Sequence, residues 1–152
     1  MKQLFMDKYR RAQSADHGSP KVIVKMGHWH VYRGEGPSNL QTLGNFVSEL
    51  ARSTGGASFH VAIHAHNAAG GFRSLSAWPD SFPDPLIARS LPVDQWTVVD
   101  LHPLRARFGQ LAATLRGDQR DQFRRLVFGF DAALYIGGMR PATYELNPGV
   151  KY

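Results

Sequence analysis

The chain has 152 residues, no cysteine and a formal net charge of +6. Its length suits one domain with a single core, and the lack of cysteine excludes disulfides, thiolate metal sites and a cysteine nucleophile. There is no run of about 18 apolar residues, so we expect no membrane span. The arginines recur mostly at helical spacing, which indicates a solvated helix face, and we expect a soluble protein with no nucleic-acid partner.

Residues 1–15 do not have the pattern of a signal peptide, because no apolar core is followed by a small-residue cleavage site. Leu4, Phe5 and Tyr9 instead share one stripe of a short predicted helix. We therefore expect a cytoplasmic protein. An amphipathic helix followed by a buried strand is the order of elements expected in the middle of a larger fold. We expect residues 1–152 to form one truncated domain whose amino-terminal half is missing.

Residues 21–33, KVIVKMGHWHVYR, predict a buried strand that stops at Gly27. β-branched residues favour an extended backbone, and Gly27 allows a turn that presents His28 and His30 beyond the strand end. If the backbone stays extended, both imidazoles point to the same side. His30 is then the candidate general base or metal ligand, because an imidazole titrates near neutrality, and His28 assists or orients it. The alternative is that His30 only hydrogen-bonds neighbouring backbone.

Residues 40–52 predict an amphipathic helix that contains a glycine. A glycine inside a helix costs roughly 1 kcal/mol against alanine. We therefore expect Gly44 to mark a close contact with a neighbouring element.

Residues 58–66, SFHVAIHAH, predict a second strand in which His64 and His66 face the same way. Two imidazoles at this spacing can bind one metal ion, with a third ligand supplied by another element. Histidines at alternating positions also occur on the wetter face of an edge strand, and this alternative stays open.

Asp100 and His102 follow a third predicted strand, residues 95–101. An aspartate that accepts a hydrogen bond from a histidine orients the imidazole, as in hydrolytic triads. The alternative is that both residues cap the helix that begins near Leu104. A fourth strand is predicted at residues 128–136 and is followed by Gly137, Gly138 and Arg140. The loop at residues 67–84 is either a functional lid or a loose connection. Further helices are predicted at residues 85–90, 104–115 and 118–126.

Strands that alternate with helices predict an α/β fold, here a mostly parallel sheet of about four strands with helices on both faces. Ligands of such sheets bind outside the carboxyl ends of the strands. We therefore expect the residues that follow the four strands to converge, with Asp100, His102 and Arg140 as substrate or supporting groups.

Four segments, KVIVKMGHWHVYRG, LGNFVSELARSTGGASFHVAI, WTVVDLHPLR and FDAALYIGGMRPAT, together resemble a known superfamily. The chain resembles the carboxyl-terminal half of the erythromycin esterase-like proteins, the ChaN-type haem-uptake lipoproteins and the Tiki/TraB proteins. The resemblance implies that His30 is the motif histidine, that Gly27 is its partner, and that the fold is half of an α/β sheet. The superfamily's glutamates and histidines near the start of the full domain have no counterpart before Lys21.

Two functions follow as expectations. The first is a hydrolase-like domain that acts on an ester or related bond of a small-molecule substrate, with His30 as base and His28 beside it. This domain is expected to be inactive if the missing half supplies essential carboxylates. The alternative is a module that binds a divalent metal or haem without catalysis, through His64, His66 and one of His28 or His30. A third interpretation is a remnant that keeps only the fold.

Overall fold

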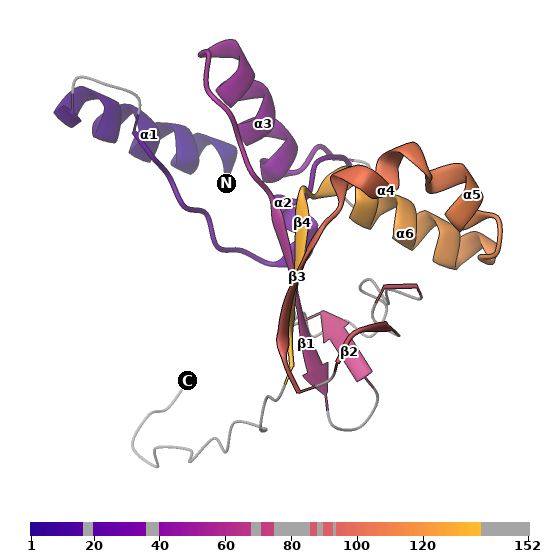
Figure 1. Ribbon diagram of the computed structural model, residues 1–152. Helices are drawn as coiled ribbons and strands as arrows, with labels where there is room; N and C mark the ends of the chain where they lie inside the picture. Colours follow the sequence, from indigo (N-terminus) through magenta and orange to yellow (C-terminus); the bar gives the residue numbers. More distant parts are fainter. Residues whose placement is uncertain are drawn as a thin grey trace, which may run out of the picture.

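The structure is a computed structural model that describes residues 1–16, 20–35, 40–67, 71–74, 86–87, 90–92 and 94–137. Six helices and four strands lie in these ranges (Figure 1). In chain order they are α1 (Lys2–Asp16), α2 (His28–Val31), α3 (Leu43–Ser53), β1 (Val61–Asn67), β2 (Gly71–Ser74), β3 (Trp96–Asp100), α4 (His102–Ala106), α5 (Phe108–Ala112), α6 (Gly117–Gly129) and β4 (Ala132–Ile136).

The four strands form one mixed sheet in the order β2-β1-β4-β3. Only β1 and β4 are parallel, whereas β2 pairs with β1 and β3 pairs with β4 in antiparallel fashion. The prediction of a mostly parallel sheet is therefore wrong. The cause lies in the connection from β3 to β4: α4, α5 and α6 gather beyond one end of the sheet, so the chain re-enters the sheet from the end at which it left (Figure 1).

The prediction of helices on both faces is also wrong. In Figure 1 the helices gather at the end of the sheet where β1 begins. One face of the sheet packs against the core, which contains Ala62, Ala133 and Tyr135 together with Leu126 and Phe130. On the other face Val61, Ile63, Trp96 and Val98 are exposed, at 39%, 37%, 71% and 69%.

The predicted strand at residues 21–26 is absent from the sheet. This segment runs as an irregular, drawn-out connection between α1 and α2 (Figure 1). His28–Val31 form a helical turn rather than a continuation of a strand. The two imidazoles of His28 and His30 therefore do not alternate as on a strand, and His28 is buried whereas His30 is exposed.

Most of the other predicted elements are present. The helices predicted at 1–15, 40–52 and 118–126 are confirmed as α1, α3 and α6, and the strands predicted at 58–66, 95–101 and 128–136 as β1, β3 and β4. The helix predicted at 104–115 is divided into α4 and α5 at Arg107, whose φ and ψ of −106° and 6° depart from helical values. Strand β2 lies inside the predicted loop at 67–84, most of which falls outside the described residues.

The predicted close contact at Gly44 is confirmed. A methyl group on Gly44 would overlap the backbone carbonyl of Val31 and would lie 2.7 Å from the carbonyl oxygen of Tyr32. Glycine thus lets the first turn of α3 touch the backbone at the end of α2. Among the described residues no helix is long and apolar enough to cross a membrane.

Candidate functional site

The end of β3 meets the starts of β1 and β4, and six side chains with acid, base or guanidinium groups collect there. Because β3 is antiparallel to β4, Asp100 pairs with Ala132 and so lies beside Asp131. We call this group the Asp131 cluster; it consists of Arg33, His60, Asp100, His102, Arg105 and Asp131.

Asp131 is 4% exposed and is the centre of the cluster. Arg33 donates two hydrogen bonds to it, from Nη1 to Oδ1 at 2.8 Å and from Nη2 to Oδ2 at 2.5 Å. The backbone N–H of His60 donates a third, to Oδ2 at 2.8 Å. Burial by itself would raise the pKa of Asp131, but these hydrogen bonds and the Arg33 charge outweigh it and lower the pKa to about 2. Asp131 is therefore a fixed anion at neutral pH.

Arg105 links the cluster to the end of α6 through hydrogen bonds. Its Nε donates to the carbonyl oxygen of Val127 at 3.0 Å, and its Nη2 donates to that of Phe130 at 2.8 Å. The same Nη2 lies 3.4 Å from Asp131 Oδ1. Arg105 thus satisfies carbonyl groups at the helix end and places a positive charge at the edge of the site.

His60 is buried beside Asp131 and links the start of β1 to α2. Its Nδ1–H donates to the carbonyl oxygen of Val31 at 2.7 Å, and its Nε2 lies 3.0 Å from the Ser58 hydroxyl. Burial is the main cause that lowers the pKa of His60. The ring is consequently neutral near pH 7 and serves as a structural hydrogen-bonding group.

His102 is the accessible imidazole of the cluster, with half of its side chain exposed. Its Nδ1 lies 2.9 Å from Asp100 Oδ1, and its backbone N–H donates to the same oxygen at 3.0 Å. These two hydrogen bonds lower the pKa of Asp100. Nε2 of His102 lies 3.3 Å from Asp131 Oδ1, longer than a normal hydrogen bond, so Asp100 is the partner that orients the ring.

For Asp100 and His102 the sequence left two alternatives, an aspartate that orients the imidazole and a pair that caps the following helix. Asp100 accepts from the first backbone amide of α4, although Leu101 is the N-cap residue of this helix, and it also orients the imidazole. An imidazole whose Nδ1–H is held by a carboxylate presents Nε2 as the nitrogen that accepts or gives a proton. Nε2 of His102 lies 3.3 Å from Asp131 Oδ1, and half of the His102 side chain is exposed.

A second group of histidines lies on the core-facing side of the sheet. The rings of His28, from α2, and His64, from β1, have centroids 5.8 Å apart. His64 stacks on Tyr135 at 4.9 Å, and His28 contacts Phe130 edge-on at 4.8 Å. Burial, followed by the neighbouring His64, lowers the pKa of His28 to about 3. His28 is therefore neutral at pH 7, the form that binds transition metals.

The remaining predicted site residues are not part of either group. His30 is exposed, and within the described residues no hydrogen bond to its side chain is present. Gly27 has φ and ψ of −57° and 146°, which any residue can adopt, and a Cβ there would meet only the His30 ring, at 3.7 Å. The side chain of His66 and all of Arg140 lie outside the described residues. The catalytic role of His30 stays a prediction.

The sequence analysis missed four members of the Asp131 cluster: Arg33, His60, Arg105 and Asp131. For Asp131 alone, the sequence contains a signal of a buried, paired charge. Asp131 is the single charge in FGFDAALYI, and a charged residue inside an apolar run is usually buried only when it is paired. Its partners lie 98 and 26 residues away, so no local pattern identifies them.

A scan against protein-family models finds no match, and comparisons with curated proteins and with solved structures find no significant similarity.

Proposed function

We propose that the Asp131 cluster is a hydrolytic acid–base site in which His102 exchanges the proton and Asp100 orients its ring. The single observation that supports this function is the 2.9 Å contact between His102 Nδ1 and Asp100 Oδ1 on a half-exposed imidazole. By comparison, His28 is buried with a pKa lowered to about 3, and this makes it a poor proton carrier near pH 7.

In this mechanism Nε2 of His102 removes a proton from a water molecule as the water oxygen attacks the carbonyl carbon of an ester. The positive charge that forms on the ring is stabilised by the Asp100 carboxylate. His102 then returns the proton to the leaving alkoxide, so the products are a carboxylic acid and an alcohol. Arg105 is the positive charge at the same edge, paired there with Asp131.

The resemblance of the sequence to erythromycin esterase-like proteins favours the same class of reaction, hydrolysis of an ester in a small molecule. It assigns the base to His30, whereas the hydrogen-bond geometry favours His102. Carboxylates from an amino-terminal half of a larger domain remain part of this proposal, because within the described cluster only Asp100 is hydrogen-bonded to the His102 ring at normal distance.

The test is hydrolysis of p-nitrophenyl acetate by the purified chain and by its His102→Ala and Asp100→Asn variants. We expect His102→Ala to lower kcat/KM by about a hundredfold, the usual contribution of a positioned proton carrier. Asp100→Asn should lower kcat and leave KM nearly unchanged, since Asp100 acts through the ring. Equal rates for the chain and for His102→Ala would remove His102 from the mechanism.

A second candidate function, binding of a divalent metal ion, is supported by the His28–His64 pair. Both imidazoles are buried, and the ring centroids lie 5.8 Å apart on two different elements. Two ligands are fewer than a zinc or manganese site needs. Within the described ranges no group of three histidine or acidic side chains is arranged to hold a metal ion. The sequence offers His66 as the third ligand.

Haem fits this pair less well than a metal ion does. A haem group needs an axial ligand at the edge of a broad apolar cavity. An apolar cavity among the described residues lies between α1 and residues 22–25, and neither His28 nor His64 lines it.

Metal binding is tested by titration of zinc and manganese into the chain and into its His64→Phe variant. Phenylalanine keeps a ring to stack on Tyr135 but removes the nitrogen ligand. We expect stoichiometric binding in the parent chain and its loss in the variant. Binding of equal strength in both would exclude His64 as a ligand.

A further inference from the structure

Residues 20–26 have the sequence of a strand, yet they lie outside the sheet. The segment PKVIVKM is rich in β-branched residues, and within the described part of the chain the sheet consists of β1, β2, β3 and β4. Among the described residues, no hydrogen bond reaches the backbone of residues 21–26. Its N–H and C=O groups are therefore available to a partner, as on the open edge of a sheet.

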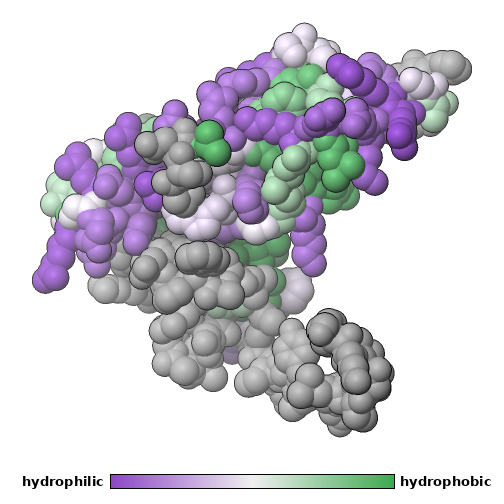
Figure 2. Space-filling view, turned by 180° about the vertical axis from the view of Figure 1, so that it is seen from behind, coloured by the Kyte–Doolittle hydropathy of each residue, from purple (hydrophilic) through white to green (hydrophobic). Residues whose placement is uncertain are grey.

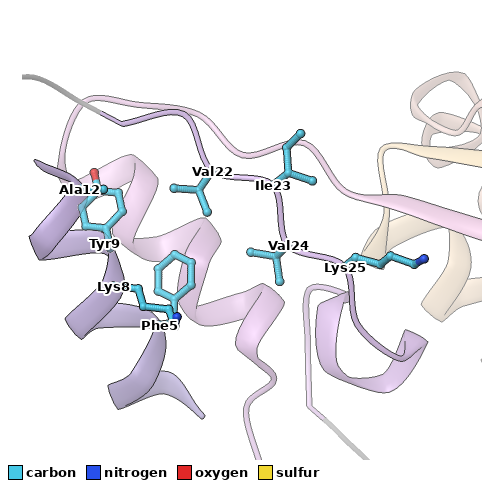
Figure 3. Close-up of a pocket in the computed structure, with 8 residues that line it drawn as sticks. All are labelled: Phe5, Lys8, Tyr9, Ala12, Val22, Ile23, Val24 and Lys25. Carbon is cyan, nitrogen blue, oxygen red and sulfur yellow. The ribbon is translucent and has the colours of Figure 1, made fainter. Parts of the chain in front are cut away.

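An apolar groove runs beside this segment. It encloses about 430 Å³ and lies between one face of α1 and residues 22–25; its lining consists of Phe5, Lys8, Tyr9, Ala12, Val22, Ile23, Val24 and Lys25. In Figure 3 Phe5, Tyr9, Val22 and Val24 turn toward the space between the two elements, whereas Ile23 and Lys25 point away from it. The volume is within the range of ligand sites in proteins.

The α1 side of the groove packs against α3 through the ring of Phe5. The ring of Phe5 stacks on Tyr9 at 6.0 Å and meets Phe46 of α3 edge-on at 6.3 Å. On the other side Ile23 is 97% exposed and Val22 47%. Figure 2 shows apolar surface open to solvent, bordered by hydrophilic side chains, on the side of the molecule that carries α1 and α3.

The charged residues that line the groove are both lysines. Lys8 and Lys25 are among the lining residues, no acidic residue is, and Lys21 flanks the segment. All three lysines are exposed. A partner that pairs with this segment therefore benefits from acidic residues interspersed with apolar ones.

We propose that residues 20–26 and α1 form a docking site for an extended strand of a partner protein in which apolar and acidic residues alternate. The strand adds to residues 21–26 through backbone hydrogen bonds, and its apolar side chains enter the groove beside Phe5 and Tyr9. The unpaired backbone favours a peptide over an amphiphile, because an acyl chain cannot satisfy it. This site is independent of the hydrolytic proposal, since it shares no residue with the Asp131 cluster.

The test is fluorescence anisotropy with two synthetic peptides of about eight residues, one alternating valine with glutamate and one alternating valine with lysine. We expect saturable binding of the glutamate peptide, about tenfold tighter than that of the lysine peptide. Equal binding of both peptides, or no binding of either, would overturn the proposal.

Proline substitutions separate strand addition from simple occupation of the groove. Ile23→Pro and Val24→Pro each remove one backbone N–H and keep the segment extended. Successive amides of an extended chain point to opposite sides, so one of the two variants should lose binding, while Ile23→Thr retains it. If both proline variants bind as the parent does and decanoate displaces the peptide, the groove is an amphiphile site and the proposal is wrong.

Discussion

Asp131 shows how a single residue can connect distant parts of this chain. It lies between Phe130 and Ala132, where the sequence predicts only a buried strand. Its carboxylate accepts hydrogen bonds from Arg33 and from the His60 amide, and so it joins the start of β4 to the segment after α2 and to the start of β1. A buried charge of this kind is tolerated only because its partners are positively charged and well placed.

Replacement of Asp131 by asparagine is expected to destabilise the protein by on the order of 3 kcal/mol, because Arg33 would lose its bidentate partner at a largely buried position. Urea unfolding measures this loss. Asp121→Asn, at an exposed position of α6, is the matched control and should change stability by less than about 0.5 kcal/mol. A similar, small change in both variants would show that the ion pair contributes little.

The pKa of His28 predicts how stability depends on pH. Its pKa is lowered from the ordinary value of 6.5 to about 3 in the folded chain, so the unfolded chain binds the proton first as the pH falls. The contribution of His28 is fully present above about pH 6.5 and is lost progressively between there and about pH 3. His28→Gln, which cannot titrate, should show a shallower fall in melting temperature from pH 7 to pH 4. An identical pH profile would mean that His28 is not desolvated.

At the scale of single elements, the first turn of α3 depends on Gly44. Alanine normally stabilises a helix interior by about 1 kcal/mol relative to glycine. Here the added methyl group would overlap the backbone of Val31, which cannot move without shifting α2. We therefore expect Gly44→Ala to destabilise the protein by about 2 kcal/mol or more.

Gly109 provides the comparison, because it lies in α5 and a Cβ there would meet nothing within 4 Å. Gly109→Ala should be neutral or stabilising by up to about 1 kcal/mol. Thermal unfolding of the two variants decides the question. A stabilising effect of Gly44→Ala would show that α2 and α3 are not in contact.

The helices were predictable because their apolar periodicity is local, and α1, α3 and α6 are where the sequence indicates them. The predicted strand at residues 21–26 was wrong because β-propensity does not say whether a neighbouring strand exists to pair with it. The direction of β3 could not be predicted from the local sequence either, because it depends on where α4, α5 and α6 pack. Because β3 is antiparallel to β4, Asp100 and His102 lie beside Asp131 and not beside the ends of the other predicted strands.

At the scale of the whole molecule, one face of the sheet lacks a covering layer within the described residues. Its central row consists of Ile63, Leu134 and Val98, which neighbour one another across three strands. An apolar sheet face normally packs against helices or a second sheet. The exposure of Ile63 and Val98 therefore predicts binding of apolar dyes.

Val98→Thr should lower the fluorescence of a bound apolar dye and change the free energy of unfolding by less than about 0.5 kcal/mol, because Val98 is 69% exposed. Val99→Thr, one residue further along β3, is the control, since Val99 packs against the core and its replacement should destabilise the protein. Equal destabilisation by both would place Val98 in a covered surface.

His102, rather than His30, is the histidine proposed to exchange the proton, and one comparison of hydrolysis rates tests this proposal. The rate of p-nitrophenyl acetate hydrolysis is measured for the parent chain, for His102→Ala and for His30→Ala, with each variant first shown to retain its melting temperature. We expect a loss of about a hundredfold in His102→Ala and a rate close to that of the parent in His30→Ala. A loss confined to His30→Ala would rule out His102 and assign the base to the histidine that the sequence motif indicates.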